Sequence, residues 1–117
     1  MMSKTLPTMI ISSHLCLLTD GLLGRFPVVR TNGAGEIISF DILDGDFEEI
    51  GGMIFRGGVM VCGVPDDFVG ITAVGKEDFV RQLSPFALCE HAANIAVLSG
   101  GDLQSLSGSF SAWRPKL

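Results

Sequence analysis

Short runs of apolar or alternating residues, each ended by Gly, Asn, Asp or Pro, fill the first part of the chain. Alternation is clearest in residues 36–43, where Ile38, Phe40 and Ile42 share one face, as in a strand with one buried side. The same reasoning predicts strands at residues 26–31, 46–50, 53–56, 59–64 and 68–74. Because short turn sequences join neighbouring runs, we expect these strands to pair as an antiparallel β-meander.

Residues 8–18 fit two different periods. Apolar residues from Met9 to Leu17 would share one face of a strand, and those from Ile10 to Leu18 would also form a helical stripe. We favour the strand and leave the helix open as an alternative. A strand here would add one more member to the meander.

The period changes from two to 3.6 in the last third of the chain. Residues 76–83 place their apolar side chains on one stripe, with two acidic residues in the first turn, which predicts a short helix. The pair Ser84-Pro85 ends this helix and begins a second one, because Ser is a favoured N-cap and Pro suits the first helical position. We expect the second helix to run from residue 85 to about residue 98 and to stop at the Gly100-Gly101 pair.

Serines alternate with apolar residues from 105 to 112, which predicts a final strand with a wet face at the edge of the sheet. The expected fold class is therefore α+β. It consists of a mainly antiparallel meander of about six to eight short strands, packed against two consecutive C-terminal helices. A chain of 117 residues suits one core, so we expect residues 1–117 to form a single domain.

Composition narrows the classes of partner. Thirteen acidic residues against eight basic ones give a formal charge of −5, which disfavours nucleic acid and anionic membranes, since both are usually held by a basic face. We find no apolar run of membrane-spanning length. Three Cys without framework spacing indicate reduced thiols, so we expect a cytoplasmic protein with no bound cofactor.

The cysteines and histidines form the most interesting chemical pattern. His14-x-Cys16 near the start is mirrored by Cys89-x-His91 near the end, and Cys62 lies between them. Imidazole and thiolate are good zinc or iron ligands, so these five residues are candidate metal ligands. The late pair weakens this hypothesis, because residues two apart on a helix point in nearly opposite directions.

A small Cys/His-dependent enzyme is a second hypothesis, with Cys89 as the nucleophile and His91 or His14 as its base. The alternative explanation for the same residues is structural. Free Cys often packs as a small buried hydrophobe, and histidines are often surface groups. Local spacing alone does not decide between the two.

Acidic residues cluster before and after the middle of the chain. They are Asp41, Asp44, Asp46, Glu48 and Glu49, with Asp66 and Asp67 at a later turn. A solvated hairpin face is the simplest interpretation, and docking onto a basic macromolecular surface is the functional alternative.

The leading functional hypothesis is a non-catalytic binding or interaction module. It follows largely from the lack of an established catalytic motif, such as a G-x-S-x-G elbow or an H-E-x-x-H metal pair. A helix packed on a sheet can leave a pocket for a small hydrophobic ligand, and an open sheet edge can bind a protein partner or a second copy of the chain.

Overall fold

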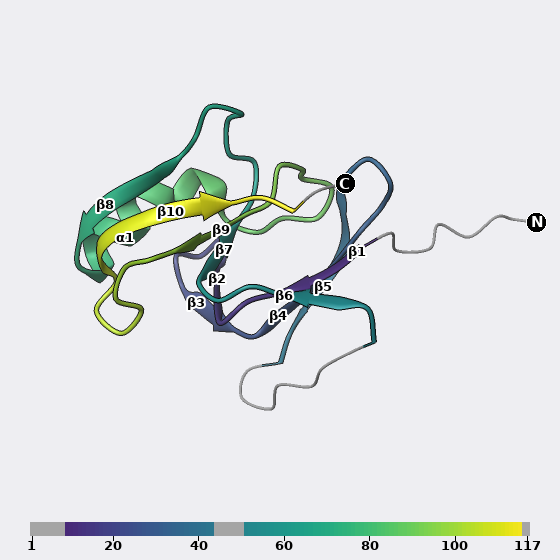
Figure 1. The fold of residues 1–117 in the computed structure, drawn as a ribbon, viewed down its shortest axis with the longest axis horizontal. Coiled ribbons are helices and arrows are strands. Elements are labelled where there is room, and N and C mark those ends of the chain that lie inside the picture. Colours follow the sequence, from purple (N-terminus) through teal and green to yellow (C-terminus); the bar gives the residue numbers. More distant parts are fainter. Residues whose placement is uncertain (1–8, 44–50, 116–117) are drawn as a thin grey trace, which may run out of the picture.

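The structure, a computed structural model, describes residues 9–43 and 51–115. It is mostly β, with 44% strand and one helical segment of 11 residues. The helical segment consists of α1 (Lys76–Leu83) and a 3-10 turn, η1 (Ser84–Phe86). The strands form two sheets in which parallel and antiparallel pairs are mixed (Figure 1).

The first sheet has four strands. Their spatial order is β5 (Ile37–Ile42), β4 (Pro27–Thr31), β1 (Met9–Ser12) and β6 (Met53–Phe55). β1 pairs antiparallel with β4 and parallel with β6. A parallel neighbour needs a long connection, so this sheet cannot be a simple meander.

The second sheet has six strands. Their spatial order is β3 (Leu23–Arg25), β2 (Leu15–Leu17), β7 (Val59–Val61), β9 (Ala96–Ser99), β10 (Ser107–Trp113) and β8 (Gly70–Val74). β2 and β7 are parallel, and the other neighbours are antiparallel.

Three of the strands in the first sheet continue directly into strands of the second. β1 leads into β2 through His14, β4 follows β3 through Phe26, and β6 leads into β7 through Gly57-Gly58. The bends lie side by side, since the Phe26 amide donates to the His14 carbonyl at 3.0 Å and the Leu15 amide to the Gly58 carbonyl at 3.0 Å. The two sheets are therefore joined by one bent three-stranded ribbon.

The His14 side chain belongs to this bend. Its Nδ1 accepts a hydrogen bond from the Gly58 amide at 3.3 Å, and its ring meets Phe55 edge-on with centroids 5.2 Å apart. Phe26, on the other side of the ring, has a φ of 52°, a conformation that costs energy for a bulky residue. A Cβ at Gly57 would lie 3.0 Å from Cε1 of His14, so glycine leaves room for the imidazole.

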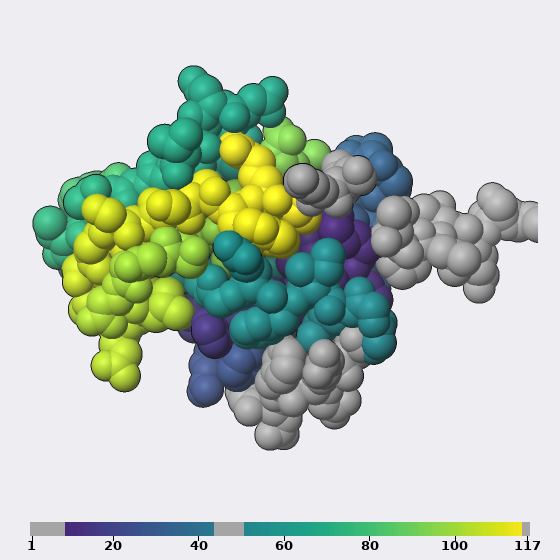
Figure 2. All heavy atoms as spheres, viewed as in Figure 1, coloured from purple at the N-terminus to yellow at the C-terminus, as the bar shows by residue number. Residues whose placement is uncertain are grey.

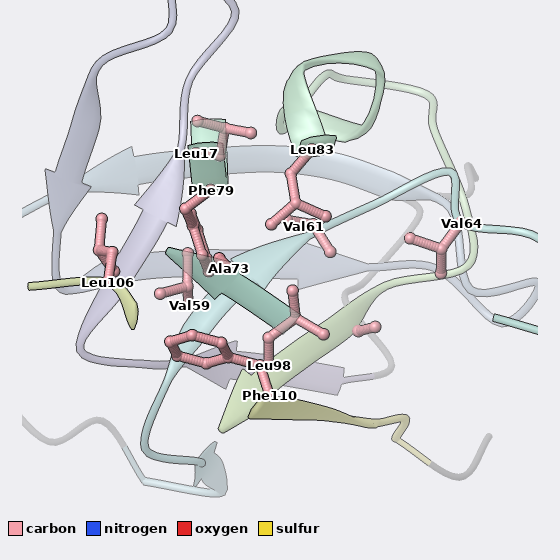
Figure 3. Close-up of a cluster of buried hydrophobic side chains, with 11 residues drawn as sticks. Leu17, Val59, Val61, Val64, Ala73, Phe79, Leu83, Leu98, Leu106 and Phe110 are labelled. Atoms are coloured by element: carbon pink, nitrogen blue, oxygen red, sulfur yellow. The ribbon is translucent and has the colours of Figure 1, made fainter. Parts of the chain in front are cut away.

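β7 lies between two hydrophobic clusters, and its alternate side chains enter one or the other. The cluster under α1 comprises Leu17, Val59, Val61, Val64, Ala73, Phe79, Leu83, Ala96, Leu98, Leu106 and Phe110, and these side chains converge in Figure 3. The cluster under the four-stranded sheet comprises Ile11, Cys16, Val29, Ile37, Met60, Cys62, Leu88, Ile95 and Val97. The prediction that residues 59–64 hold a central strand, apolar on both faces, is confirmed for β7.

α1 covers the outer edge of β8. The Asp78 carboxylate accepts from the Val74 amide at 2.9 Å, and the Gln82 side-chain amide donates to the Thr72 carbonyl at 3.0 Å. An open edge strand exposes such backbone groups to pairing with another chain. Here two helix side chains satisfy them.

The predicted fold class is wrong in its helical part. Residues 76–83 form the expected helix, but the second C-terminal helix does not exist, and residues 96–99 are the central strand β9. Between them Ala87 is extended, and His91 and Asn94 have φ angles of 72° and 57°, which no α-helix accommodates. Burial of Ala96, Val97 and Leu98 on both faces outweighs the helical stripe that the sequence suggests.

Two further expectations about the sheet need correction. The final strand, predicted as an edge, lies inside the six-stranded sheet between β9 and β8. The antiparallel meander is also wrong, because β1–β6 and β2–β7 are parallel pairs in two separate sheets.

The segment that the sequence left ambiguous between strand and helix, residues 8–18, contains the two strands β1 and β2 and no helix in its described part. The strand predicted at residues 46–50 lies outside the described residues.

Candidate ligand-binding cavity

A cavity of about 90 Å³ opens at one end of the four-stranded sheet. Four segments that are distant in sequence form its wall: the start of β1, the end of β4 with its hairpin loop, the segment before β9, and the segment after β10. In Figure 2 the yellow C-terminal segment lies beside purple β1, with the blue hairpin loop next to them. The lining residues are Met9, Thr31, Ala34, Gly35, Asn94, Ile95, Arg114 and Pro115.

The hairpin loop that forms one wall is held by Asn32. Its Oδ1 accepts hydrogen bonds from the amides of Ala34 at 2.9 Å and Glu36 at 3.0 Å, and its Nδ2 donates to the Glu36 carboxylate at 3.0 Å. Gly35 supplies the positive φ of 82° that closes the turn. The wall is therefore preorganised by local hydrogen bonds.

Thr31 is the unusual polar residue of the cavity. It is fully buried, and its hydroxyl is one of two buried side-chain oxygens without a hydrogen-bond partner in the part of the chain that the structure describes. The other, Ser12, does not line the cavity. Burying a hydroxyl without a partner costs about 1–3 kcal/mol. The hydroxyl itself has almost no accessible area, so a ligand in the cavity would reach it through a small shift of the wall. On these terms Thr31 is a candidate ligand contact.

Arg114 is the charged residue of the lining. One of its guanidinium nitrogens donates to the Pro65 carbonyl at 2.6 Å, which fixes the side chain next to the cavity. Within residues 9–43 and 51–115 its charge is not neutralised by an ion pair, because the salt bridges there are Arg30–Asp41 and Arg81–Asp78. A guanidinium has five N–H donors, so most of the fork can still bind an anion.

The fourth wall is the irregular segment that replaces the predicted helix. Asn94 lies here with its φ of 57°, just before buried Ile95. The segment is tied to both sheets, since the Gly63 amide donates to the Ala93 carbonyl at 2.7 Å and the Ile37 amide to the Ala92 carbonyl at 2.8 Å. The strained Asn94 backbone therefore sits in a segment anchored on both sides.

Together these walls define the chemistry that the cavity can accept. Met9, Ile95 and Pro115 provide apolar surface, whereas Thr31 and Arg114 provide donors. None of the described residues that line the cavity carries a carboxylate. Its volume is smaller than the roughly 150 Å³ of an engineered cavity that holds benzene, so the enclosed part of a ligand is limited to a few non-hydrogen atoms.

The five candidate metal ligands do not come together in one site, although Cys62 and Cys89 are neighbours. No group of three or more His, Cys, Asp or Glu that could hold a metal ion occurs among the described residues, which include all five. Cys16 is fully buried, and burial raises the pKa of its thiol to about 12. His14 lies at the bend, and the exposed His91 is held through its backbone, which donates to the Ile37 carbonyl at 2.8 Å.

The thiol proposed as a nucleophile also has other partners. The Cys89 sulfur contacts the Glu90 carbonyl oxygen at 3.4 Å. Burial raises the pKa of Cys62, whose sulfur donates to the Ala87 carbonyl at 3.2 Å. A general base must reach the proton that it removes, and the hydrogen bonds of both thiols run to backbone carbonyls.

The acidic residues proposed for docking are only partly described. Asp41 is exposed and pairs with Arg30 at 3.4 Å, across the β4–β5 ladder. Asp66 and Asp67 are exposed in the turn after Pro65. The other members of the set, Asp44, Asp46, Glu48 and Glu49, lie outside the described residues.

Sequence reasoning did not single out Thr31, Asn94 or Arg114 as site residues. Arg114 had one signal in the sequence, because a charged residue between the end of the final strand and Pro115 is a candidate surface contact. Thr31 looks like an ordinary strand residue, and its missing hydrogen-bond partner is a property of the fold alone.

The described part of the chain contains no helix that is long and apolar enough to cross a membrane. Comparisons with protein-family models, with curated proteins and with solved structures give no match to this chain. The cavity must therefore be interpreted from its own residues.

Proposed function

We propose that this chain is a non-catalytic binding domain whose cavity holds a small carboxylate with a short apolar group. The buried hydroxyl of Thr31, which has no hydrogen-bond partner among the described residues, carries the proposal. Arg114 supplies a positive charge that would pair with the carboxylate, and Met9, Ile95 and Pro115 supply apolar surface for its chain. The ligand class is therefore narrower than a generic hydrophobic molecule.

The size and position of the cavity support a compact ligand. A volume of about 90 Å³ encloses only a short group, and the hairpin loop and the C-terminal segment both line it. Both of these walls are fixed by hydrogen bonds in the free protein, through Asn32 and through the Arg114–Pro65 contact. Preformed walls reduce the entropy that binding must overcome.

Chemical-shift titration of the isotope-labelled full chain tests this proposal. Acetate, propionate and butyrate are the probes, and propanol and butyramide are the uncharged comparisons. Short carboxylates should shift the amides of Ala34, Gly35 and Asn94 in a saturable way, because these residues line the cavity. Uncharged probes should bind at least about tenfold more weakly, since they form no charge-assisted pair with Arg114.

Two variants separate binding from folding. Thr31→Val keeps the shape of the side chain and removes the hydroxyl, so it should weaken butyrate binding while the free protein stays as stable or gains about 1 kcal/mol. Arg114→Gln should weaken binding about 10- to 100-fold. The matched control is Thr72→Val, at an exposed threonine that bonds to Ser109 outside the cavity.

Two results would contradict the proposal. One is a loss of stability in Thr31→Val with no change in carboxylate binding, which would mean that the hydroxyl has a structural partner. The other is a set of equal, non-saturable shifts for charged and uncharged probes, which would mean that the cavity has no specificity for carboxylates.

A further inference from the structure

Cys62 and Cys89 lie next to each other although 26 residues separate them in sequence. The Cys62 sulfur donates to the Ala87 carbonyl at 3.2 Å, and the Cys62 amide donates to the Phe86 carbonyl at 2.9 Å. These two hydrogen bonds align Cys62, directly after β7, with residues 86 and 87, and Cys89 follows two positions later.

This alignment brings the two cysteines close enough for Cys89 to affect the Cys62 thiol. The amide and the thiol of Cys89 are both among the groups that shift the pKa of Cys62. A disulfide requires Cα atoms about 4.4–6.8 Å apart, so the pair must reach this spacing for the bond to form. The Cys89 sulfur contacts the Glu90 carbonyl at 3.4 Å, so a rotation about its own Cα–Cβ bond can redirect it.

The two thiols differ in exposure in a way that suits stepwise oxidation. Cys89 is exposed and can meet an oxidant from solution, whereas Cys62 is 2% exposed and can be reached only from within the protein. Cys16, also free, is fully buried beneath Gly24, where an added Cβ would lie 3.1 Å from its sulfur. Cys16 shares its hydrophobic cluster with Cys62, but no oxidant in solution reaches its fully buried sulfur.

We propose that Cys62 and Cys89 form a reversible redox pair that closes to a disulfide when the chain meets a low-molecular-weight disulfide such as oxidised glutathione. The Cys89 thiolate attacks one sulfur of oxidised glutathione, breaks its S–S bond and releases one glutathione thiolate. Cys62 then gives up its proton and attacks the Cys89 sulfur, which releases the second glutathione. Two protein thiols are oxidised, and one glutathione disulfide is reduced to two thiols.

The bond would fix the segment that carries the cavity wall. Residues 86–95 run from the end of η1 past Cys89 to Asn94 and Ile95, which line the cavity. The strained φ angles of His91 and Asn94 lie in this segment. Closure ties its first half covalently to β7. Formation of the bond does not depend on the proposed carboxylate, so the two proposals can fail separately.

Mass spectrometry of the folded full chain tests the redox pair. The protein is incubated with mixtures of oxidised and reduced glutathione, quenched with acid, unfolded, alkylated and digested. We expect a loss of two hydrogen atoms, a cross-linked peptide joining Cys62 and Cys89, and alkylation of Cys16 alone. The glutathione ratio that gives half oxidation should be at least about tenfold more reducing for the folded chain than for the same chain in urea.

Three variants complete the test. Cys89→Ser, at an exposed site, should abolish both the disulfide and the glutathione adduct. Cys62→Ala should stop at a glutathione adduct on Cys89, and this result is read only if its circular dichroism matches wild type. Cys16→Ala is the matched control and should oxidise like wild type. A wild-type chain that stops at the adduct, cross-links through Cys16, or oxidises equally well in urea would overturn the proposal.

Discussion

Gly58→Ala is the substitution that tests the bend between the two sheets most directly. Gly58 ends the β6–β7 connection, with a φ of 136°, and donates its amide to the His14 ring. A Cβ at this position would lie 2.2 Å from the carbonyl oxygen of Leu98 on β9. Real Cβ atoms do not approach a backbone oxygen so closely, so β7 and β9 must separate to accept alanine.

The cost follows from the sum of four effects. An L-residue with positive φ costs about 1–2 kcal/mol, and loss of freedom in the unfolded chain returns about 0.4–1 kcal/mol. Overpacking against a neighbouring strand adds about 1–3 kcal/mol, and a lost ladder hydrogen bond adds about 1 kcal/mol. Gly58→Ala should therefore destabilise the protein by roughly 2–6 kcal/mol, a large part of the 5–15 kcal/mol typical of a domain.

Gly63→Ala is the matched control. Gly63 also has a positive φ, of 75°, but no atom lies within 4 Å of the position that its Cβ would take. Its expected cost is about 0–1.5 kcal/mol, because only the conformational part applies. Urea unfolding followed by circular dichroism gives both free energies. Equal costs for the two variants would refute the close approach of Gly58 to β9.

Three further predictions concern the core, the helix and the buried thiol. Phe79→Ala removes a fully buried ring and should cost about 3–5 kcal/mol; an unchanged thermal midpoint would contradict this core. The Val74 amide lowers the pKa of Asp78, so the stability that Asp78 contributes is present above about pH 4 and is lost as pH falls through its folded pKa. Asp78→Asn should then flatten the loss of stability measured by urea unfolding below that pH, and an unchanged slope would argue against the contact. Iodoacetamide at about pH 8 should alkylate Cys89 and spare Cys16, whose pKa burial raises to about 12; peptide mapping that shows equal labelling would contradict its burial.

Local patterns predicted the elements that local physics determines. The alternation of residues 36–43 corresponds to β5, and the stripe with acidic residues in its first turn corresponds to α1 with its bounds unchanged. The loop at residues 32–35 forms because Asn32 satisfies its amides, a signal written in the sequence itself. In each of these cases the partners lie within a few residues of one another.

The sequence-based predictions fail where contacts between residues distant in sequence determine the structure. Ile10 pairs with Met53 and Leu15 with Val59, and no local period reveals a parallel register over such separations. Residues 85–98 carry small and apolar residues at helical spacing, but their backbone groups find partners on Ile37 and Gly63 instead. These contacts, together with β9, outweigh a weak helix propensity.

Two of the residues that the spacing of Cys and His singled out have packing roles in the fold. His14, a candidate ligand and base, has its Nδ1 bonded to the Gly58 amide and its ring packed beside Phe55 at the bend. Cys16 lies beneath Gly24 in the core. The spacing of His14 and Cys16 reflects a strand that bends from one sheet into the other. The Nδ1 atom of His14 accepts a backbone hydrogen bond, and the sulfur of Cys16 is buried in the core.

The residues that line the cavity come together only because the ribbon bends from one sheet into the other. Met9, Thr31, Asn94 and Arg114 come from four segments whose meeting depends on the bend, the hairpin loop and the strand β9 together. Thr31 differs from most buried hydroxyls, because nearly all of these have hydrogen-bond partners in folded proteins. A polar group that the core leaves unsatisfied, beside a cation without an ion pair among the described residues, is the combination that a small anion would complete.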